Sequence, residues 1–275
     1  MVNVARAEAG AIGAVAGTLE TAPSARLGQG FGSGAIEVAG SRDGRFAFVS
    51  VEYPGWVAVY NLRAALAGRF KRSSYVGALR LGGAVVGLAV SPNGRWLYAT
   101  SELAAGARSL SRPGTLSVID IAEAERDPSR SVVATVEAGC QPVRVVASAN
   151  GATVWVTARA SDDLLAFSAS KLTHDPAHAL LAAIRVGEAP VGLALVRHDT
   201  RVVVADSNRS NAPGGASALT VVDASAALAG RPAVLGAIAA GSFPREMSLA
   251  AGGRTLLVGN FASGQLEAIR VSELP

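Results

Sequence analysis

The sequence contains few of the residues from which several common kinds of site are built. Its single cysteine, Cys140, excludes an internal disulfide and any metal site made of several cysteines. Its three histidines, His174, His178 and His198, form no recognisable Ser-His-Asp arrangement with other residues. No apolar run approaches the length needed to span a bilayer, so we expect no membrane span.

The rest of the composition is typical of a globular chain with a large core. Of the 275 residues, 50% are hydrophobic and 17% are charged. The 25 basic residues exceed the 21 acidic ones too modestly to predict nucleic-acid binding, and all but Lys71 and Lys171 are arginines. The basic run at 69–72 is interpreted as a solvated loop. The small apolar segment 9–19 follows Glu8 and precedes no A-x-A site, so we expect no signal peptide, and both a cytoplasmic and an exported location stay open.

One short phrase recurs five times along the chain. Its copies read SRDGRFAFVS, SPNGRWLYAT, SANGATVWVT, VRHDTRVVVA and AAGGRTLLVG, at 41–50, 91–100, 148–157, 196–205 and 250–259. Asn-Gly and Asp-Gly allow the positive φ of a tight turn, and the alternating apolar residues that follow are typical of a half-buried strand. The phrase therefore predicts a β-hairpin that recurs at regular intervals.

The segments around the phrase also recur in a constant order. One apolar segment precedes each hairpin, and a third and fourth follow its second strand. The hairpin glycines Gly44, Gly94, Gly151 and Gly253 are separated by 50, 57 and 102 residues, the last span covering two repeats. Four strands in about fifty residues are typical of a β-propeller blade, whereas a β-sandwich gives no reason for five recurrences. The sequence predicts an all-β propeller of four-stranded antiparallel blades, five of them visible, with short helical turns at 63–68 and 224–230.

The two ends of the chain predict how the propeller closes. The last repeat stops after its third strand, and the segment 18–27 precedes the first inner strand without a blade of its own. Pairing 18–27 with 264–271 would complete the last blade and cover two sheet edges. We therefore expect a single propeller domain over 18–275, with its ring closed by N- and C-terminal strands. Residues 1–17 are an unplaced extension, in which 2–10 faintly resembles a third strand.

Two stretches resemble known propeller families. The segment VVGLAVSPNGRWLYAT, at 85–100, resembles the YVTN-type repeat of bacterial and archaeal propellers. The segment 243–271 is similar to the last blade of the lactonase-type seven-bladed propellers. The resemblance covers 34–271 and implies the fold far more than an activity. The chain departs from both families in showing five repeats rather than seven, and its three histidines lie in a connection and a hairpin rather than at a lactonase-type central site.

Aligned repeats place one set of residues around the mouth of the central channel. This set is Ala35, Gly87, Arg144, Gly192 and Glu246, with Arg245 next to it and Glu37 one step deeper. Arg144, Arg245 and Glu246 then form either ion pairs that seal the mouth or a site for an anion or carboxylate, which the arginine fork suits.

The loops after the second strands bring further polar residues to the same face: Glu52, Tyr53, Glu102, Arg159, Asp206, Asn208 and Asn260. The run 206–211 resembles the start of a calcium loop but lacks its glycine and its distal glutamate. A shared divalent cation, such as calcium, is the one cofactor that the residues suggest, with oxygen ligands from Glu37, Asp206, Asn208 and Asn260.

Two classes of function follow from these residues. The first is a non-catalytic propeller that presents a loop-lined channel face to a small ligand or a protein partner. The second, implied by the family resemblance, is a lactonase-like hydrolase that opens a sugar lactone or a related small ester. The missing histidines and the lack of a carboxylate cluster favour the first class, and a metal ion bound at the channel mouth would favour the second.

Overall fold

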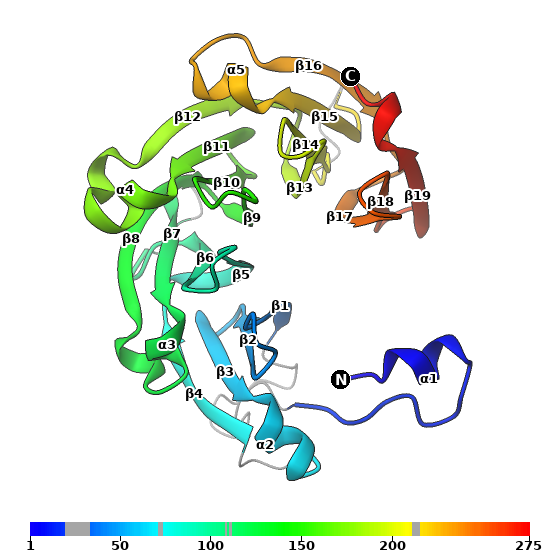
Figure 1. Cartoon of the computed structure of the whole chain (residues 1–275). Helices are drawn as coiled ribbons and strands as arrows, with labels where there is room; N and C mark the ends of the chain where they lie inside the picture. The colour runs from blue at the N-terminus through cyan, green and yellow to red at the C-terminus, as the bar shows by residue number, and fades with distance from the viewer. Residues whose placement is uncertain (20–33, 71–73, 108, 110–111, 211–214) are drawn as a thin grey trace.

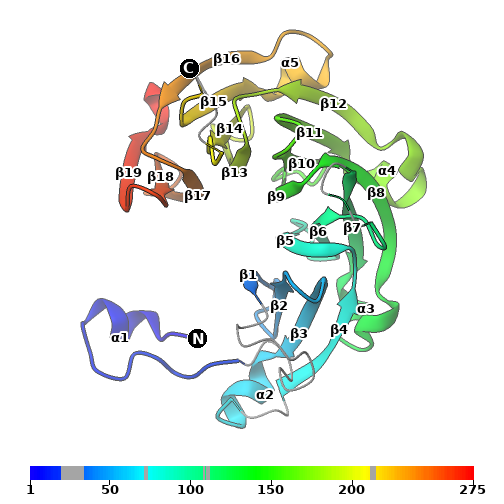
Figure 2. The same ribbon diagram turned by 180° about the vertical axis from the view of Figure 1, so that it is seen from behind.

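A computed structural model of the chain describes residues 1–19, 34–70, 74–107, 109, 112–210 and 215–275. Within these residues, nineteen strands form five antiparallel sheets. The sheets stand side by side as propeller blades and curve around a common centre, as Figures 1 and 2 show from opposite sides. The predicted all-β propeller with five blades is confirmed.

Each blade is built from consecutive strands, ordered from the centre of the arc outward. Blade 1 contains β1 (Ala35–Gly40), β2 (Phe46–Val51), β3 (Trp56–Asn61) and β4 (Tyr75–Arg80). Blade 2 contains β5 (Gly83–Val90), β6 (Trp96–Leu103), β7 (Pro113–Asp120) and β8 (Val132–Cys140). Blade 3 contains β9 (Pro142–Ala147), β10 (Thr153–Ala158), β11 (Asp163–Ser168) and β12 (Leu180–Arg185). Blade 4 contains β13 (Pro190–Val196), β14 (Arg201–Asp206), β15 (Ala218–Asp223) and β16 (Val234–Ala239), and blade 5 contains β17 (Pro244–Ala250), β18 (Thr255–Asn260) and β19 (Gln265–Arg270).

The recurring phrase forms the hairpin between the first and second strands of each blade. In blade 2 the Asn93 side-chain oxygen accepts hydrogen bonds from the Ser91 hydroxyl at 2.7 Å and from the Arg95 N–H at 3.0 Å. The Ser91 hydroxyl oxygen in turn accepts the Trp96 N–H at 2.9 Å. Gly94 has a φ of 73°, which glycine adopts at no steric cost. The predicted hairpin is confirmed, and in blade 2 its serine and asparagine also stabilise the turn through local hydrogen bonds.

Short helices connect the third and fourth strands of the blades. They are α2 (Leu62–Ala67), α3 (Ile121–Ala124) with the 3₁₀ turn η3 (Pro128–Arg130), α4 (Ala169–His174) with η4 (Pro176–His178), and α5 (Ala224–Leu228); η5 (Val271–Glu273) follows β19. Each α-helix begins after a polar residue whose side chain accepts a hydrogen bond from the N–H three residues later, at Asn61, Asp120, Ser168 and Asp223. The two predicted helical turns are confirmed. No helix in the described residues is long and apolar enough to cross a membrane.

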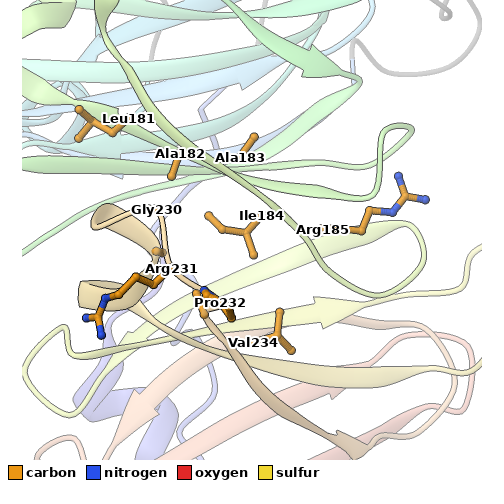
Figure 3. A pocket seen from close by; sticks show the side chains of 11 residues that line it. Leu181, Ala182, Ala183, Ile184, Arg185, Gly230, Arg231, Pro232 and Val234 are labelled. Atoms are coloured by element: carbon orange, nitrogen blue, oxygen red, sulfur yellow. The ribbon is translucent and has the colours of Figure 1, made fainter.

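Neighbouring blades pack through apolar cores and through these connections. Phe48 of blade 1 lies in one buried cluster with Leu97 and Ile119 of blade 2. On the rim, the connections of blades 2 to 4 contact the outer strand of the preceding blade: η3 contacts β4, α4 contacts β8 and α5 contacts β12. Figure 3 shows the last of these seams as a groove of about 520 Å³ lined by Ile184, Pro232 and neighbouring residues, with Arg185 and Arg231 at its margin. Arg185 donates to Asp162 at 2.9 Å, so this groove is a packing seam with one paired cation.

The described blades form an arc that is open between blades 1 and 5 (Figures 1 and 2). The segment predicted to close the ring, 18–27, lies outside the described residues except for Thr18 and Leu19. Closure by terminal strands therefore stays a prediction. Blade 5 has three strands rather than four within the described residues.

Residues 1–19 lie at the open side of the arc and contain a short capped helix between two bridged residues (Figure 1). The helix α1 (Val4–Glu8) begins after Asn3, whose side-chain oxygen accepts the Arg6 N–H at 3.0 Å. Val2 forms an antiparallel bridge with Val15 on the other side of the helix. The segment 2–10, which faintly resembles a third strand in sequence, is therefore mostly helical, with Val2 as its bridge residue.

A hydroxyl group in the second strand links the inner strands of neighbouring blades. The Thr157 hydroxyl oxygen accepts the Arg144 N–H at 3.1 Å, and the hydroxyl donates to the Val191 carbonyl of blade 4 at 2.9 Å. Thr100 makes the same two bonds between blades 2 and 3, and Ser50 makes them between blades 1 and 2. Each hydroxyl satisfies one donor and one acceptor that the backbone would otherwise leave buried without partners.

Replacing Thr157 with valine tests this link. Thr157→Val removes the hydroxyl and leaves the Arg144 N–H and the Val191 carbonyl without it, so we expect the free energy of unfolding to fall by about 1–3 kcal/mol in urea denaturation. Thr157→Ser is the matched control, because it loses a methyl group but keeps the hydroxyl. If Thr157→Val were no less stable than Thr157→Ser, the hydroxyl link would contribute nothing to the packing of blades 3 and 4.

Candidate functional site

One position in each inner strand lies at an equivalent place around the centre of the arc. In blades 1 to 3 it is identified by its N–H, which donates to the second-strand hydroxyl, and in blades 4 and 5 by the matching strand register. These inner-ring positions are Glu37, Gly87, Arg144, Gly192 and Glu246. Charged residues occupy blades 1, 3 and 5, and glycines occupy blades 2 and 4.

The structure corrects the predicted alignment in blade 1. The sequence comparison placed Ala35 in the ring and Glu37 one step deeper, whereas Glu37 itself occupies the ring. The pairing of the first and second strands is broken at this place in all five blades, so the break does not set blade 1 apart. The distance to the hairpin glycine, rather than the apolar residues of the segment, gives the correct position. Counting seven residues back from the hairpin glycine reaches Glu37 from Gly44, just as it reaches the ring residue in blades 2, 3 and 5.

The two glycines of the ring are required by close backbone approach. A Cβ on Gly87 would lie 2.3 Å from the Val143 carbonyl oxygen, and a Cβ on Gly192 would lie 2.7 Å from the Arg245 carbonyl oxygen. Neither distance is compatible with a side chain, because the obstructing atoms belong to the backbone. The glycines also leave the space beside Arg144 free of side chains from blades 2 and 4.

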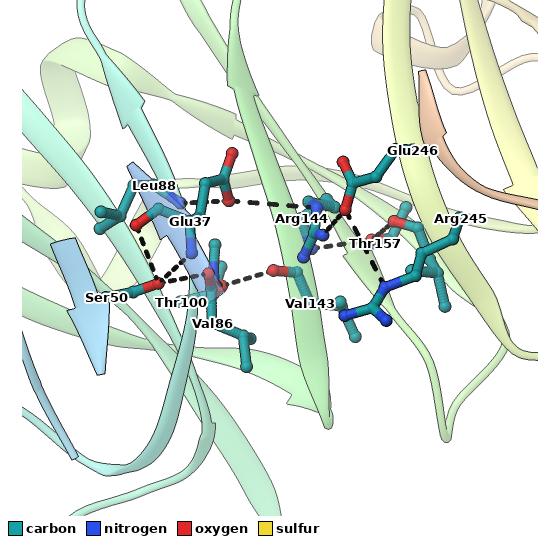
Figure 4. A network of polar contacts seen from close by, with 12 residues as sticks. Glu37, Ser50, Val86, Leu88, Thr100, Val143, Arg144, Thr157, Arg245 and Glu246 are labelled. Atoms are coloured by element: carbon teal, nitrogen blue, oxygen red, sulfur yellow. Dashed lines mark hydrogen bonds and ion pairs between the residues drawn. The ribbon is translucent and has the colours of Figure 1, made fainter. Parts of the chain in front are cut away.

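Arg144 extends across this space to carboxylates on both sides, as Figure 4 shows. Its guanidinium forms an ion pair with Glu246 of blade 5, and its Nε lies 4.0 Å from Glu37 Oε2 of blade 1. The side chain of Arg144 is 8% exposed, and its Nε has no hydrogen-bond partner within the described residues. The predicted pairing of Arg144 with Glu246 is therefore present, and a buried donor remains available at its centre.

Glu37 is the carboxylate most affected by its surroundings in this ring. Burial raises the pKa of Glu37, while Arg144 and the Leu88 N–H, which donates to Glu37 Oε2 at 2.9 Å, oppose that rise. The nearby Glu246 carboxylate raises the pKa further. A carboxyl group whose pKa is raised binds a proton more readily than an exposed glutamate does.

A cavity of about 250 Å³ lies on the channel face next to this ring. It is lined by the aliphatic side chains and arginines of the inner strands and by residues of the loops around them. The lining residues are Ile36, Glu52, Val86, Glu102, Val143, Arg144, Arg159, Val191, Arg209, Phe243, Arg245 and Phe261. Four arginines thus face two glutamates among the lining residues.

Arg159 and Glu102 neutralise one another at this cavity. Arg159 donates to Gln141 Oε1 at 2.6 Å, and its Nη2 lies 3.0 Å from Glu102 Oε1. Burial raises the pKa of Glu102 and lowers the pKa of Arg159, and each partner opposes the shift of the other. The predicted site residue Arg159 therefore reaches the channel face, where it is held by a carboxylate and an amide.

Arg209 and Arg245 are less neutralised than the other two arginines. Arg245 Nε lies 4.0 Å from Glu246 Oε1, and its guanidinium lies 5.5 Å from the centre of the Phe261 ring. The Arg209 guanidinium lies 6.0 Å from the centre of the Phe243 ring and has no ion pair within 4.0 Å among the described residues. Both cations therefore lie beside aromatic rings, next to the opening of the cavity.

Sequence reasoning missed seven of these lining residues: Ile36, Val86, Val143, Val191, Arg209, Phe243 and Phe261. A usable signal exists for Phe243, which directly precedes the proline that begins an inner strand, as Gln141 and Ala189 do. That position therefore approaches the channel mouth in several blades. Arg209 lies in a loop of irregular length, for which the repeat supplies no register.

None of the four predicted oxygen ligands, Glu37, Asp206, Asn208 and Asn260, lines the cavity. Asp206 and Asn260 are buried at the ends of β14 and β18, and the Asn208 N–H donates to the Glu188 carbonyl oxygen at 3.0 Å. In the part of the chain that the structure describes, no group of three or more His, Cys, Asp or Glu side chains is placed to hold a metal ion.

Comparisons with known proteins add the fold but no family. No family model matches the chain, and no curated protein matches its sequence.

Among solved structures, hydrazine synthase of Kuenenia stuttgartiensis is similar with a TM-score of 0.65 at 16% identity, over 86% of this chain and 71% of that one. A periplasmic gluconolactonase of Pseudomonas aeruginosa has a TM-score of 0.57 at 20% identity, over 85% of this chain and 65% of that one. A candidate 6-phosphogluconolactonase of Bacteroides uniformis has a TM-score of 0.58 at 14% identity, over 85% and 70%. At these identities the likeness shows the propeller fold alone.

Asp206 has a structural environment of its own in blade 4. Its Oδ2 accepts the Thr220 hydroxyl at 2.6 Å, and its carboxylate also accepts the Gly187 N–H from the preceding crossover loop. Its Oδ1 is buried without a hydrogen-bond partner in the described residues. Burial raises the pKa of Asp206 to about 7, although the hydrogen bonds from Thr220 and Gly187 oppose the rise.

This pKa predicts how stability depends on pH. Between about pH 4 and pH 7 the folded protein holds a proton on Asp206 that the unfolded chain has lost, so stability falls as pH rises through this window. Asp206→Asn cannot ionise, and its stability relative to the wild type should therefore rise by up to about 4 kcal/mol from pH 4 to pH 8 in urea denaturation. Asp223→Asn is the control, because hydrogen bonds to the backbone lower the pKa of Asp223: its effect on stability should be nearly constant from pH 4 to pH 8 and should follow the opposite trend only below about pH 4. A pH-independent effect of Asp206→Asn would contradict the prediction.

Proposed function

We propose that the channel face binds a small anionic ligand through its arginines, with a carboxylate as the recognised group. The observation that supports this most is the gathering of Arg144, Arg159, Arg209 and Arg245 around one cavity with two lining glutamates. Arginine presents a planar fork of donors that matches a carboxylate, and desolvated sites strengthen such contacts.

The distribution of partners among the arginines favours a ligand over a complete seal. Arg144 and Arg159 each contact carboxylates of the chain, which explains why their side chains can be buried. Arg209 is exposed, and the side chain of Arg245 is 35% exposed with its nearest carboxylate oxygen 4.0 Å from Nε. A carboxylate bound beside these two arginines would accept hydrogen bonds from their guanidiniums.

Opening of a lactone is a second candidate activity of the channel face, at the ring beside this cavity. Two of the similar structures carry lactonase names, and Glu37 places a carboxyl group of raised pKa beside Arg144. A carboxyl group of this kind could activate water, while an arginine stabilises the developing negative charge on the carbonyl oxygen. The product of the opening is a hydroxy acid, whose carboxylate suits the same arginines.

The binding proposal is tested with Arg245→Ala. Against a panel of small carboxylates, we expect the wild type to bind at least one by calorimetry and Arg245→Ala to bind it about ten- to hundredfold more weakly, because a charged hydrogen bond is lost. Arg254→Ala removes an exposed arginine from the hairpin of the same blade and should bind like the wild type. If no carboxylate binds, or if both variants bind alike, the proposal fails.

Glu246→Gln tests the same site in the opposite direction. Glu246 competes with the ligand for Arg144 and Arg245, so removing its charge should tighten carboxylate binding up to about fivefold. Weaker binding by Glu246→Gln would show that the ion pair holds the arginines in place rather than competing for them.

Release of acid from gluconolactone, followed in a pH-stat, tests the second candidate. A rate above spontaneous hydrolysis that falls in Glu37→Gln would support lactone opening. If gluconolactone is hydrolysed no faster with the protein than without it, lactone opening is contradicted and only the binding proposal stands.

A further inference from the structure

The cavity has an apolar floor that the charged rim does not explain. The residue before each inner-ring position is aliphatic in four blades, as Ile36, Val86, Val143 and Val191, and is Arg245 in blade 5. Val86, Val143 and Val191 are 5%, 4% and 3% exposed and form one cluster, against which Ile36 and Phe243 pack. The floor therefore offers no side-chain hydrogen-bond donor or acceptor from these four aliphatic residues.

An aromatic wall extends this apolar surface toward solvent. The rings of Phe243 and Phe261 pack edge to face with their centres 5.6 Å apart, and Phe261 is 65% exposed. The guanidiniums of Arg209 and Arg245 lie over these rings. A single small molecule could therefore contact the guanidiniums with one end and the aliphatic floor with the other.

We propose that the preferred ligand is a carboxylate with an apolar body, such as an aryl or branched-chain acid, rather than a polyhydroxylated sugar acid. This inference rests on the proposed function, since it requires a carboxylate at the arginines. The cavity volume of about 250 Å³ is below the range usual for drug-sized ligands and suits a small molecule. The hydroxyls of a sugar acid would lose water against Val86, Val143 and Val191 without gaining partners, whereas an aromatic or branched body has no such groups to desolvate.

Calorimetry on the whole chain with matched ligands tests the inference. We expect phenylacetate to bind about tenfold or more tightly than gluconate at one pH and one salt concentration, and benzyl alcohol, which lacks the carboxylate, to bind more weakly than phenylacetate. Both carboxylates should lose affinity in Arg245→Ala. Gluconate binding as tightly as phenylacetate, with both dependent on Arg245, would overturn the apolar-ligand inference and leave the binding proposal intact. If neither acid binds, or if Arg245→Ala binds them as tightly as the wild type does, both the binding proposal and the apolar-ligand inference are overturned.

A substitution in the floor provides an independent measurement. Val191→Thr nearly keeps the volume and adds a hydroxyl to the floor, so the preference for phenylacetate over gluconate should narrow severalfold. Val202→Thr is the control, because Val202 is buried in the core between blades 3 and 4 and does not line the cavity. Val202→Thr should prefer phenylacetate over gluconate to the same degree as the wild type, even if the variant is less stable. An unchanged preference in folded Val191→Thr would contradict the role of the floor.

Discussion

The bonds made by the second-strand hydroxyls set the geometry on which the channel face depends. Ser50, Thr100 and Thr157 each accept a backbone N–H from the inner strand of their own blade and donate to a carbonyl of the next blade. The hydroxyl fixes the distance between two inner strands because both of its partners are backbone groups. The apolar cores between blades supply most of the burial, but they do not define the height of one inner strand relative to the next.

The alternation of charge and glycine in the inner ring follows from this close spacing. Strands held so near one another leave no room for side chains at Gly87 and Gly192, where a Cβ would meet a neighbouring carbonyl oxygen. The empty positions let Arg144 contact Glu37 on one side and Glu246 on the other. Three blades therefore share a single arginine, and loss of either glycine would separate them as well as strain the backbone.

Much of the fold and part of the site could be predicted from the sequence. The turn residues and the alternation define the hairpins locally, so the number of blades and the pairing of Arg144 with Glu246 could be deduced from the repeat. Glu37 was misplaced by two residues because the small apolar residues around it define no register of their own, although counting back from Gly44 reaches it. Arg209 and Phe261 could not be placed, since their positions depend on loops that the repeat does not constrain. Asp206 was expected to be a ligand, but its burial depends on Gly187 and Thr220 from other segments.

The change of chemistry in blade 5 explains why the cavity is asymmetric. The second-strand position that carries a hydroxyl in blades 1 to 3 is Ala205 in blade 4 and Gly259 in blade 5. The inner strand of blade 5 is therefore not linked by a hydroxyl, and its floor position is Arg245 instead of an aliphatic residue. The three floor residues whose carbonyls accept a hydroxyl are all valines, whereas Ala205 offers none to the Arg245 carbonyl. The cationic half of the cavity therefore lies at the seam of blades 4 and 5, where the repeat departs from its pattern.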